Sequence, residues 1–197
     1  MKILVNNEEI DLAEGSTPLE KISDLLAALK EKNLVILETW VNEVKTEEDL
    51  LELVKLNNVE QVALVVATPA QVVFDALETA ITYLPVLKEG LLETAGLFQE
   101  GRDGEGIAKY LEALSGMGWL CHVLAGVDSC AAVEENLRGA FKKDHQNYEQ
   151  ILRDLTQAWE NRDYVLIADL MEYELAPFVE GLLPLVQSAI EGFNQKD

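Results

Sequence analysis

The sequence contains few basic residues. Lys and Arg total 15 against 36 Asp and Glu, which gives a formal net charge of −21 and a pI near 4.3. Such a charge repels nucleic-acid phosphates and anionic lipid surfaces, so we expect neither a nucleic-acid nor a membrane partner. The one basic cluster, Arg138 with Lys142 and Lys143, is too small to change this expectation. A protein, a basic peptide or a metal ion remains electrostatically acceptable.

Long uncharged apolar runs are also missing. No stretch has the length and composition that a membrane span requires. The amino terminus turns polar at Asn6, before it reaches the length of a signal peptide. We therefore expect a cytoplasmic protein. The two cysteines, Cys121 and Cys130, are expected to be reduced and buried, because free cysteine behaves as a small core hydrophobe.

Motifs that carry chemistry are absent as well. The sequence has no C-x-x-C or H-x-x-x-H pair, no Glu-x-x-His motif of a bundle metal site and no nucleophile elbow. The glycine-rich segment 101–106 follows a helical pattern rather than a strand and lacks the Gly-Lys-Ser ending of a phosphate loop, so we interpret it as a flexible connector. We predict no catalytic residue, no metal site and no cofactor, and hence a protein that is not an enzyme.

His145 is the most interesting single residue, because it occupies a helical position where an apolar side chain is expected. It could be a metal ligand, a base or a pH-sensitive latch. We favour a core or interface histidine satisfied by a hydrogen bond. Cys121 and His122 are weaker candidates of the same kind. Together with Cys130 these residues are four potential soft ligands, yet no metal-binding spacing connects them.

The first third of the chain predicts a small α+β domain, residues 1–67. Two strand-like runs, Lys2–Val5 and Glu9–Leu12, flank Asn6 and Asn7 and predict a hairpin. The capping box Thr17–Glu20 opens a helix that ends at Asn33. The remaining elements are a strand over residues 34–41, a short helix opened by Thr46 and ended by Asn57 and Asn58, and an apolar strand over 59–67 that is typical of a sheet centre.

This order, with the opening Met1–Asn6, the turn at Gly15–Thr17 and the turn at Val41–Asn42, resembles the β-grasp fold of the ubiquitin-like sulfur-carrier proteins. The resemblance implies a β-grasp scaffold. Sulfur carriers end in a flexible diglycine whose carboxylate is activated. Here the last strand continues instead into Thr68–Gln71, a capping box that opens another helix, so the resemblance does not extend to sulfur transfer.

Residues 68–197 predict an antiparallel four-helix bundle. Three of the helices have apolar stripes at helical spacing. In the first, over residues 69–100, the stripe is Val73, Leu77, Ala80, Leu84, Leu87, Leu91, Ala95 and Phe98. In the second it is Ile107, Leu111, Leu114, Gly118, Cys121 and Ala125, and Gly116 and Gly118 are expected to let a neighbouring helix approach closely. In the third, capped by Asp128 or Ser129, it is Val133, Leu137, Phe141, His145, Tyr148, Leu152, Leu155 and Trp159.

The last helix, opened by Asp163, has two apolar faces. Its main stripe runs from Ile167 to Phe193, and Pro177 and Pro184 project away from it, which predicts one curved helix. A second line on the far side consists of Leu166, Leu170 and Tyr173. Because a helix with two apolar faces needs two neighbours, we predict that these three residues bind a partner protein or a second copy of the chain.

Three hypotheses about function follow. The first is a non-enzymatic binding or regulatory protein that acts through protein–protein contacts, with a possible dimer. The second is an acidic helical chaperone for a secreted or flagellar client, suggested by small size, acidity and helical content. The third is a metal- or cofactor-dependent bundle enzyme built around His145 and the acidic residues of the last helix. The absence of catalytic spacing favours the first.

Overall fold

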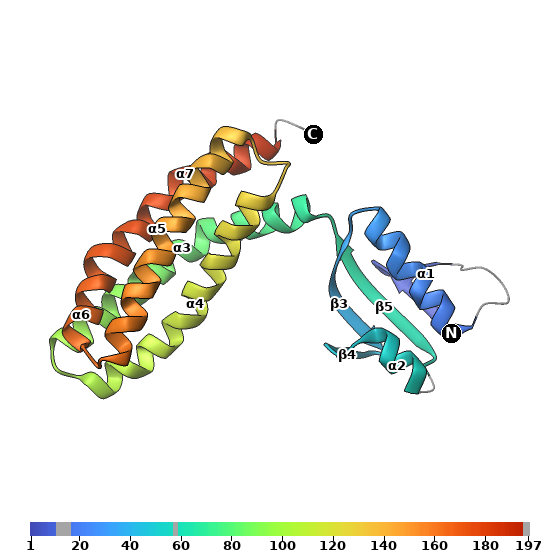
Figure 1. Ribbon diagram of the computed structural model, residues 1–197, viewed down its shortest axis with the longest axis horizontal. Coiled ribbons are helices and arrows are strands. Elements are labelled where there is room, and N and C mark those ends of the chain that lie inside the picture. Colours follow the sequence, from blue (N-terminus) through green and yellow to red (C-terminus); the bar gives the residue numbers. More distant parts are fainter. Residues whose placement is uncertain (11–16, 57–58, 195–197) are drawn as a thin grey trace. The chain divides into compact units, whose positions relative to one another are not determined.

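The computed structural model describes residues 1–10, 17–56 and 59–194. By its internal contacts the chain divides into two compact units, residues 1–72 and 73–197. The first unit is a mixed sheet with short helices and the second consists of four long packed helices, which confirms the predicted α+β class (Figure 1). The predicted turn residues Gly15 and Ser16, the end of the second strand at Leu12, and the pair Asn57–Asn58 lie outside the described residues.

The sheet has five strands in the order β2-β1-β5-β3-β4. They are β1 Lys2–Val5, β2 Glu8–Glu9, β3 Val35–Val41, β4 Val44–Thr46 and β5 Gln61–Ala67. Strand β1 pairs with β5 in parallel, and all other pairs are antiparallel. The apolar strand β5 is central, as predicted. Its alternate residues Val62, Leu64 and Val66 are buried, because one face of the sheet packs on the helices α1 Pro18–Glu31 and α2 Leu50–Leu56.

Asparagines shape both hairpin turns of the sheet. Asn6 and Asn7 have φ of 51° and 67°, and Asn42 and Glu43 have φ of 47° and 67°. Two successive left-handed residues match the twist of a two-residue hairpin, and asparagine tolerates them. The Asn6 side chain also donates to the carbonyl of Val66 and accepts from its amide, so the first turn is tied to the central strand.

The segment around Thr46 corrects the predicted order of elements. Thr46 ends strand β4, which pairs with β3 through residues 44–46, and its hydroxyl accepts from the amide of Glu48. Helix α2 begins only at Leu50, where Asp49 Oδ1 accepts from the amides of Leu51 and Glu52. The sequence does not predict strand β4, because three residues are too few to show alternation. Thr46 and Asp49 are both residue types that cap helices, so the sequence alone does not show which of them precedes α2.

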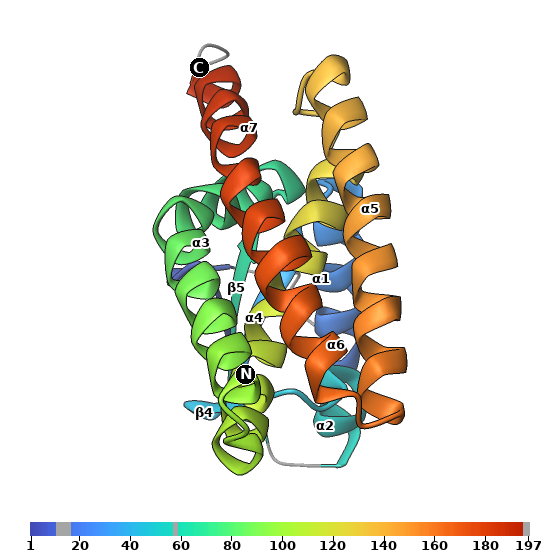
Figure 2. The same ribbon diagram turned by 90° about the vertical axis from the view of Figure 1, so that its left-hand side faces the viewer.

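The helical unit contains α3 Pro69–Gln99, α4 Asp103–Ser129, α5 Glu135–Glu160 and a final helical segment of α6 Tyr164–Asp169, η1 Leu170–Leu175 and α7 Ala176–Asn194 (Figure 2). Every residue of the stripe predicted for α3 is buried in the bundle. Among the described residues one helix, α3, is long and apolar enough to cross a membrane, a test that the core helix of a soluble protein also meets.

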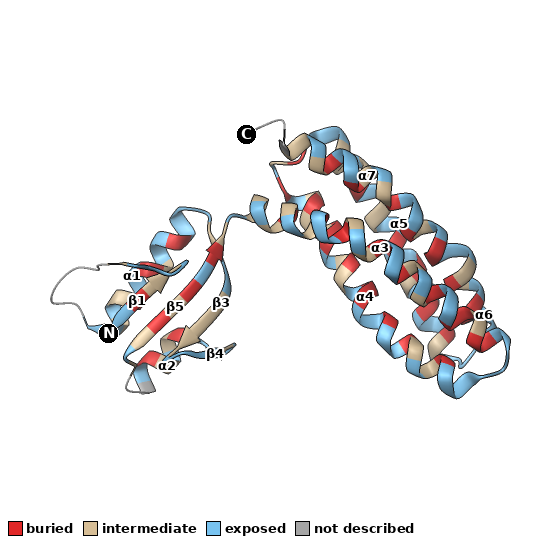
Figure 3. Cartoon of the chain, turned by 180° about the vertical axis from the view of Figure 1, so that it is seen from behind, coloured by how far each residue is buried: buried red, intermediate tan, exposed pale blue. Residues whose placement is uncertain are grey.

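Helix α4 differs from the prediction at its start and in its buried face. It begins at Asp103, so Gly104 and Gly106 are helical and the connector consists of Glu100, Gly101 and Arg102. Helix α4 has both buried and exposed residues along its length (Figure 3). Of the predicted stripe, Leu111, Leu114 and Gly118 are exposed and the other three members are half-buried. The buried residues are instead Gly106, Tyr110, Ala113, Gly116, Met117, Leu120, Val123, Leu124 and Val127. The helix is apolar in nearly every direction, so its periodicity could not identify the core side.

Glycines 116 and 118 behave differently from one another. A Cβ atom on Gly116 would lie 2.9 Å from Leu87 Cδ1 and would overlap the Tyr83 hydroxyl, which confirms the predicted close approach of a neighbouring helix. A Cβ atom on Gly118 would meet nothing within 4 Å, so the prediction was wrong there.

Helix α5 largely follows its predicted stripe but starts later. Val133, Phe141, Tyr148 and Leu155 are buried, and the other four members are half-buried. Its N-cap is Glu134, whose side chain makes no capping bond, rather than Asp128 or Ser129. Those two residues still belong to α4, because nothing in the apolar composition of that helix stops it earlier.

The final helical segment is continuous and contains a π-helical turn that the sequence did not predict. Asp163 accepts from the amide of Leu166 and caps it, as expected. Within η1 the amide of Ala176 bonds to the carbonyl of Met171, five residues earlier. Pro177 follows at once. Its ring would clash with the carbonyl four residues earlier in a regular α-helix, and the wider turn accommodates it.

Candidate functional site

An apolar surface lies on the outside of the final helical segment. Val165, Leu166 and Tyr173 are 72%, 42% and 65% exposed, and Leu170 between them is half-buried. We call these four residues the α6 surface. It contains the predicted residues Leu166, Leu170 and Tyr173. Both α6 and η1 contact α5, and their residues Ile167 and Met171 are buried. The prediction that a partner covers this surface stays a prediction.

Acidic residues surround the α6 surface. Asp169, Glu172 and Glu174 lie among its members, and no Lys or Arg occurs from Asp163 to Asn194. Glu172 accepts a hydrogen bond from Gln99 of α3. The pKa of Tyr173 is raised, and the negative charge of the neighbouring Glu172 is the main cause. The surface therefore combines exposed apolar area with a negative rim, which favours a partner that carries basic residues.

A second apolar surface lies on α4, formed by residues whose helical spacing predicts a core stripe. Leu111 and Leu114 are 53% and 42% exposed, Gly118 is exposed, and Ile107 is half-buried. We call these residues the α4 surface. The signal that could have revealed it is the lack of a polar side on α4: a helix that is apolar all round has either two neighbours or an uncovered face.

The structure brings two of the three candidate residues with side-chain chemistry together. Cys121 Sγ of α4 lies 3.7 Å from His145 Nε2 of α5, and the same nitrogen lies 3.8 Å from Glu149 Oε1. The His145 side chain is 19% exposed. His122 is exposed and has no part in this cluster, and Cys130 is buried elsewhere on the chain as a free thiol.

The geometry of this cluster differs from that of a nucleophile–base pair oriented by an acid. In such a triad the base contacts the nucleophile and the acid through its two different ring nitrogens, whereas here Nε2 makes both contacts. Burial, and then the charge of Glu149, raise the pKa of Cys121, so the thiolate form is disfavoured. The cluster joins α4 to α5, and Tyr148 next to it donates to the Met117 carbonyl at 3.0 Å.

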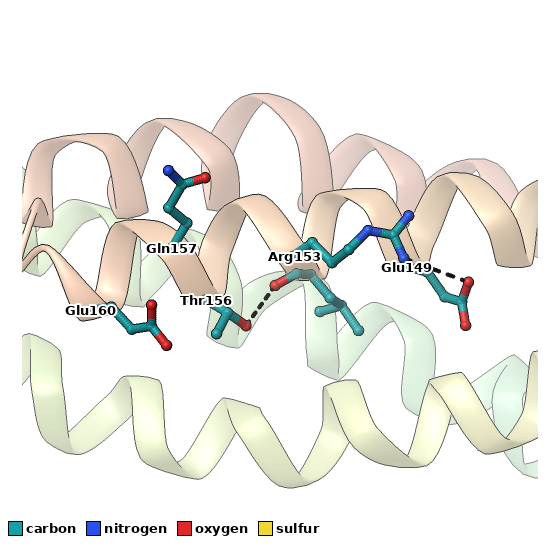
Figure 4. Close-up of a pocket in the computed structure, with 6 residues that line it drawn as sticks. Glu149, Arg153, Thr156, Gln157 and Glu160 are labelled. Carbon is teal, nitrogen blue, oxygen red and sulfur yellow. Dashed lines mark hydrogen bonds and ion pairs between the residues drawn. The ribbon is translucent and has the colours of Figure 1, made fainter.

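The surface of the bundle has open hollows. One is lined by Glu149, Leu152, Arg153, Thr156, Gln157 and Glu160 of α5, and Figure 4 shows Thr156 and Glu160 on the side of α5 that faces α4. Two others, between α3 and α4, share Glu93, Lys109 and Glu112, where Lys109 pairs with both carboxylates. In the described parts of the chain no three His, Cys, Asp or Glu side chains gather as a metal site would need.

Comparison with known proteins places the helical unit in a family. No curated protein and no solved structure matches this chain. Residues 75–185, which run from the first turns of α3 into α7, match a domain of unknown function, DUF8042. Both apolar surfaces fall within the matched residues. Because the match spans more than half of the sequence, the chain belongs to the DUF8042 family.

Proposed function

We propose that this chain is a non-enzymatic cytoplasmic protein that acts through protein–protein contacts, and that the α6 surface is its principal contact. The observation that carries the proposal is the exposure of Val165, Leu166 and Tyr173 on a capped helical segment whose opposite side is buried. Exposed apolar residues with a polar rim are typical of interaction sites. Aromatic residues such as Tyr173 are enriched in such contacts.

The arrangement of the Cys121–His145–Glu149 cluster supports the non-enzymatic part of the proposal. A raised thiol pKa and a histidine that makes both contacts through one nitrogen suit a structural link between two helices. The hollows described above are open and lie away from this cluster except at Glu149. We therefore assign His145 a structural role within the proposal.

We further propose that the amino-terminal unit is a β-grasp scaffold. The strand order β2-β1-β5-β3-β4, the parallel pair of β1 with β5 and the helix α1 that follows the first hairpin support this. Strand β5 ends at Ala67, and α3 begins two residues later with the Thr68 hydroxyl accepting from the amide of Gln71. A strand that runs directly into a helix supplies no free carboxylate, so the scaffold is proposed to have a role other than sulfur transfer.

The test replaces Leu166 and Tyr173 with Gln, which removes apolar area and adds no charge. Mass in solution and recovery of bound proteins are compared between the parent chain and the double variant. We expect the parent to bind a partner protein or a second copy and the double variant to lose that binding. The matched control is Val44→Thr, which removes an exposed apolar side chain from the edge strand β4 and keeps strand propensity.

Because both substituted side chains are exposed, the double variant should keep its thermal stability. A parent chain that stays monomeric and partner-free, or binding that the double variant and Val44→Thr affect equally, would count against the α6 surface.

A further inference from the structure

The α6 surface extends along about two turns of the final helical segment. Leu166, Leu170 and Tyr173 follow one another at steps of four and three residues. Leu166 and Tyr173 are exposed and Leu170 is half-buried, whereas Ile167 and Met171 on the opposite side are buried. The main chain here is helical throughout, so it offers no strand edge. A partner therefore has to contact this surface through side chains.

The charges that surround Tyr173 are negative. Asp169 and Glu174 are exposed, and Glu172 is half-buried. The pKa of Tyr173 is raised chiefly by the charge of Glu172, and the charge of Asp169 adds to the shift. No cation among the described residues opposes it. The carboxylates therefore lie close enough to Tyr173 to act on its hydroxyl group, and the field at the exposed aromatic side chain is negative.

Cations along this part of the chain are few. No Lys or Arg occurs from Asp163 to Asn194. Arg162 precedes the segment and is exposed at its start. Lys88 of α3 reaches the segment farther along, where it pairs with Glu180 at 2.8 Å. Negative charge therefore exceeds positive charge beside the apolar side chains, and a partner with basic residues would complement it.

A second copy of the chain is a poor occupant. A two-fold contact would bring the same carboxylates of both copies together, and each copy has a net charge of −21. The one basic stretch, Arg138 with Lys142 and Lys143, supplies no complement, because the large apolar residues beside it are not exposed. Leu137 is half-buried and Phe141 is buried. The complementary residues therefore have to come from another protein.

We propose that the α6 surface binds a basic amphipathic helix of another protein, whose apolar side covers the exposed stripe and whose Lys or Arg side chains lie beside the surrounding carboxylates. A helix fits because apolar residues over two turns of one helix are the arrangement against which the apolar side of a second helix packs. This assignment rests on the proposed function, since it names the partner of the same surface.

The experiment uses the full chain and a labelled synthetic peptide of about 18 residues, or about five helical turns, with Leu at helical spacing and Lys elsewhere. One control peptide has the same composition with Leu in alternation, and another has Glu in place of Lys. Binding is followed by fluorescence anisotropy. We expect the parent chain to bind the Lys peptide at least about tenfold more tightly than either control. Raising the salt from about 50 to about 300 mM should weaken that binding.

Because the whole chain is negative, the decisive comparison is between two variants of equal net charge. Asp169→Asn with Glu174→Gln removes two charges from the α6 surface and leaves its apolar side chains in place. It should weaken binding of the Lys peptide about fivefold. The matched control, Asp24→Asn with Glu31→Gln, removes two charges from exposed positions of α1 and should change binding less than about twofold.

The double variant Leu166→Gln with Tyr173→Gln separates this assignment from the proposed function. If it loses partner binding while the two charge variants bind the Lys peptide equally, the α6 surface remains a contact but charge does not select its partner, and the proposal of a basic helix is overturned. Equal binding of either control peptide, or no binding of the Lys peptide, would overturn it as well. So would a dimer of the parent chain that the double variant dissociates, because a second copy would then be the occupant. A parent chain that binds neither a protein nor a peptide would count against the proposed function too.

Discussion

Gly116 lies where α4 packs against α3, and the space there ends at Leu87 and the Tyr83 hydroxyl. Gly116→Ala gains about 1 kcal/mol of helix propensity. It also forces aside Tyr83, whose ring packs edge-on against Trp119, and overpacking of this kind costs about 1–3 kcal/mol. We expect a net loss of about 1 kcal/mol in the free energy of unfolding, measured by urea denaturation.

Gly118→Ala supplies the control for that substitution. The two glycines are two residues apart on one helix, but a Cβ atom on Gly118 meets nothing within 4 Å. Only the propensity term remains there, so stability should rise by up to about 1 kcal/mol. If both alanines stabilise the chain, the contact at Gly116 is softer than the structure indicates.

Single residues were predictable from sequence where their role is local. Asn6, Asn33 and Asn42 were placed at turns or helix ends, and all three adopt positive φ. The pairing of Cys121 with His145 was out of reach, because it depends on how two helices are aligned rather than on spacing along either one. The different surroundings of Gly116 and Gly118 likewise depend on how α4 packs against α3.

At the scale of elements, the final helical segment and α5 begin differently. Asp163 caps the first, whereas the side chain of Glu134 makes no capping bond at the second. Asp163→Ala should therefore lower the free energy of unfolding by about 1 kcal/mol. Glu134→Ala removes the same charge and should change it by less than about 0.5 kcal/mol. Urea denaturation of both variants at one pH checks the difference, and equal losses would mean that charge rather than the capping bond is responsible.

Elements with one apolar side were predicted well, and elements without such a side were not. The stripe of α3 was confirmed at every position because its other faces are more polar. Helix α4 was assigned the wrong face because apolar residues surround it, and only its packing partners select the buried side. Strand β4 is too short to show a period, and the π turn depends on the strain that Pro177 introduces.

At the scale of the whole molecule, each unit has a core of its own. The buried cluster of the first unit, from Ile3 to Val66, contains no residue of the bundle. Leu64→Ala in β5 should lower the stability of that unit by about 2–5 kcal/mol, because Leu64 is fully buried. Amide hydrogen exchange should accelerate throughout residues 17–56 and 61–67 and stay unchanged in α4 and α5.

Leu120→Ala in α4 is the reciprocal variant, and it should accelerate exchange in the bundle alone. If either substitution loosened both units together, the two cores would have to unfold as one cooperative body.

The fold class could be predicted because it follows from local sequence patterns. These are alternation and asparagine turns in the first third, and helical stripes and caps in the rest. A binding surface is harder to predict, because the residues that cover it lie on another molecule. The sequence indicated Leu166, Leu170 and Tyr173 because they lie opposite a clear stripe. It concealed Leu111 and Leu114 because they look identical to core residues.

The wide turn at Leu170–Leu175 has an evolutionary consequence. A π turn contains one residue more than an α turn does. The buried faces of α6 and α7 therefore stay aligned as they would in a regular α-helix that is one residue shorter. A homologue lacking a single residue between positions 170 and 175 would keep Ile167 and Val179 in the core, but its regular turn would require a residue other than proline at position 177. Insertion or deletion at this point is thus a route by which related chains could reshape the outside of the bundle while leaving its interior intact.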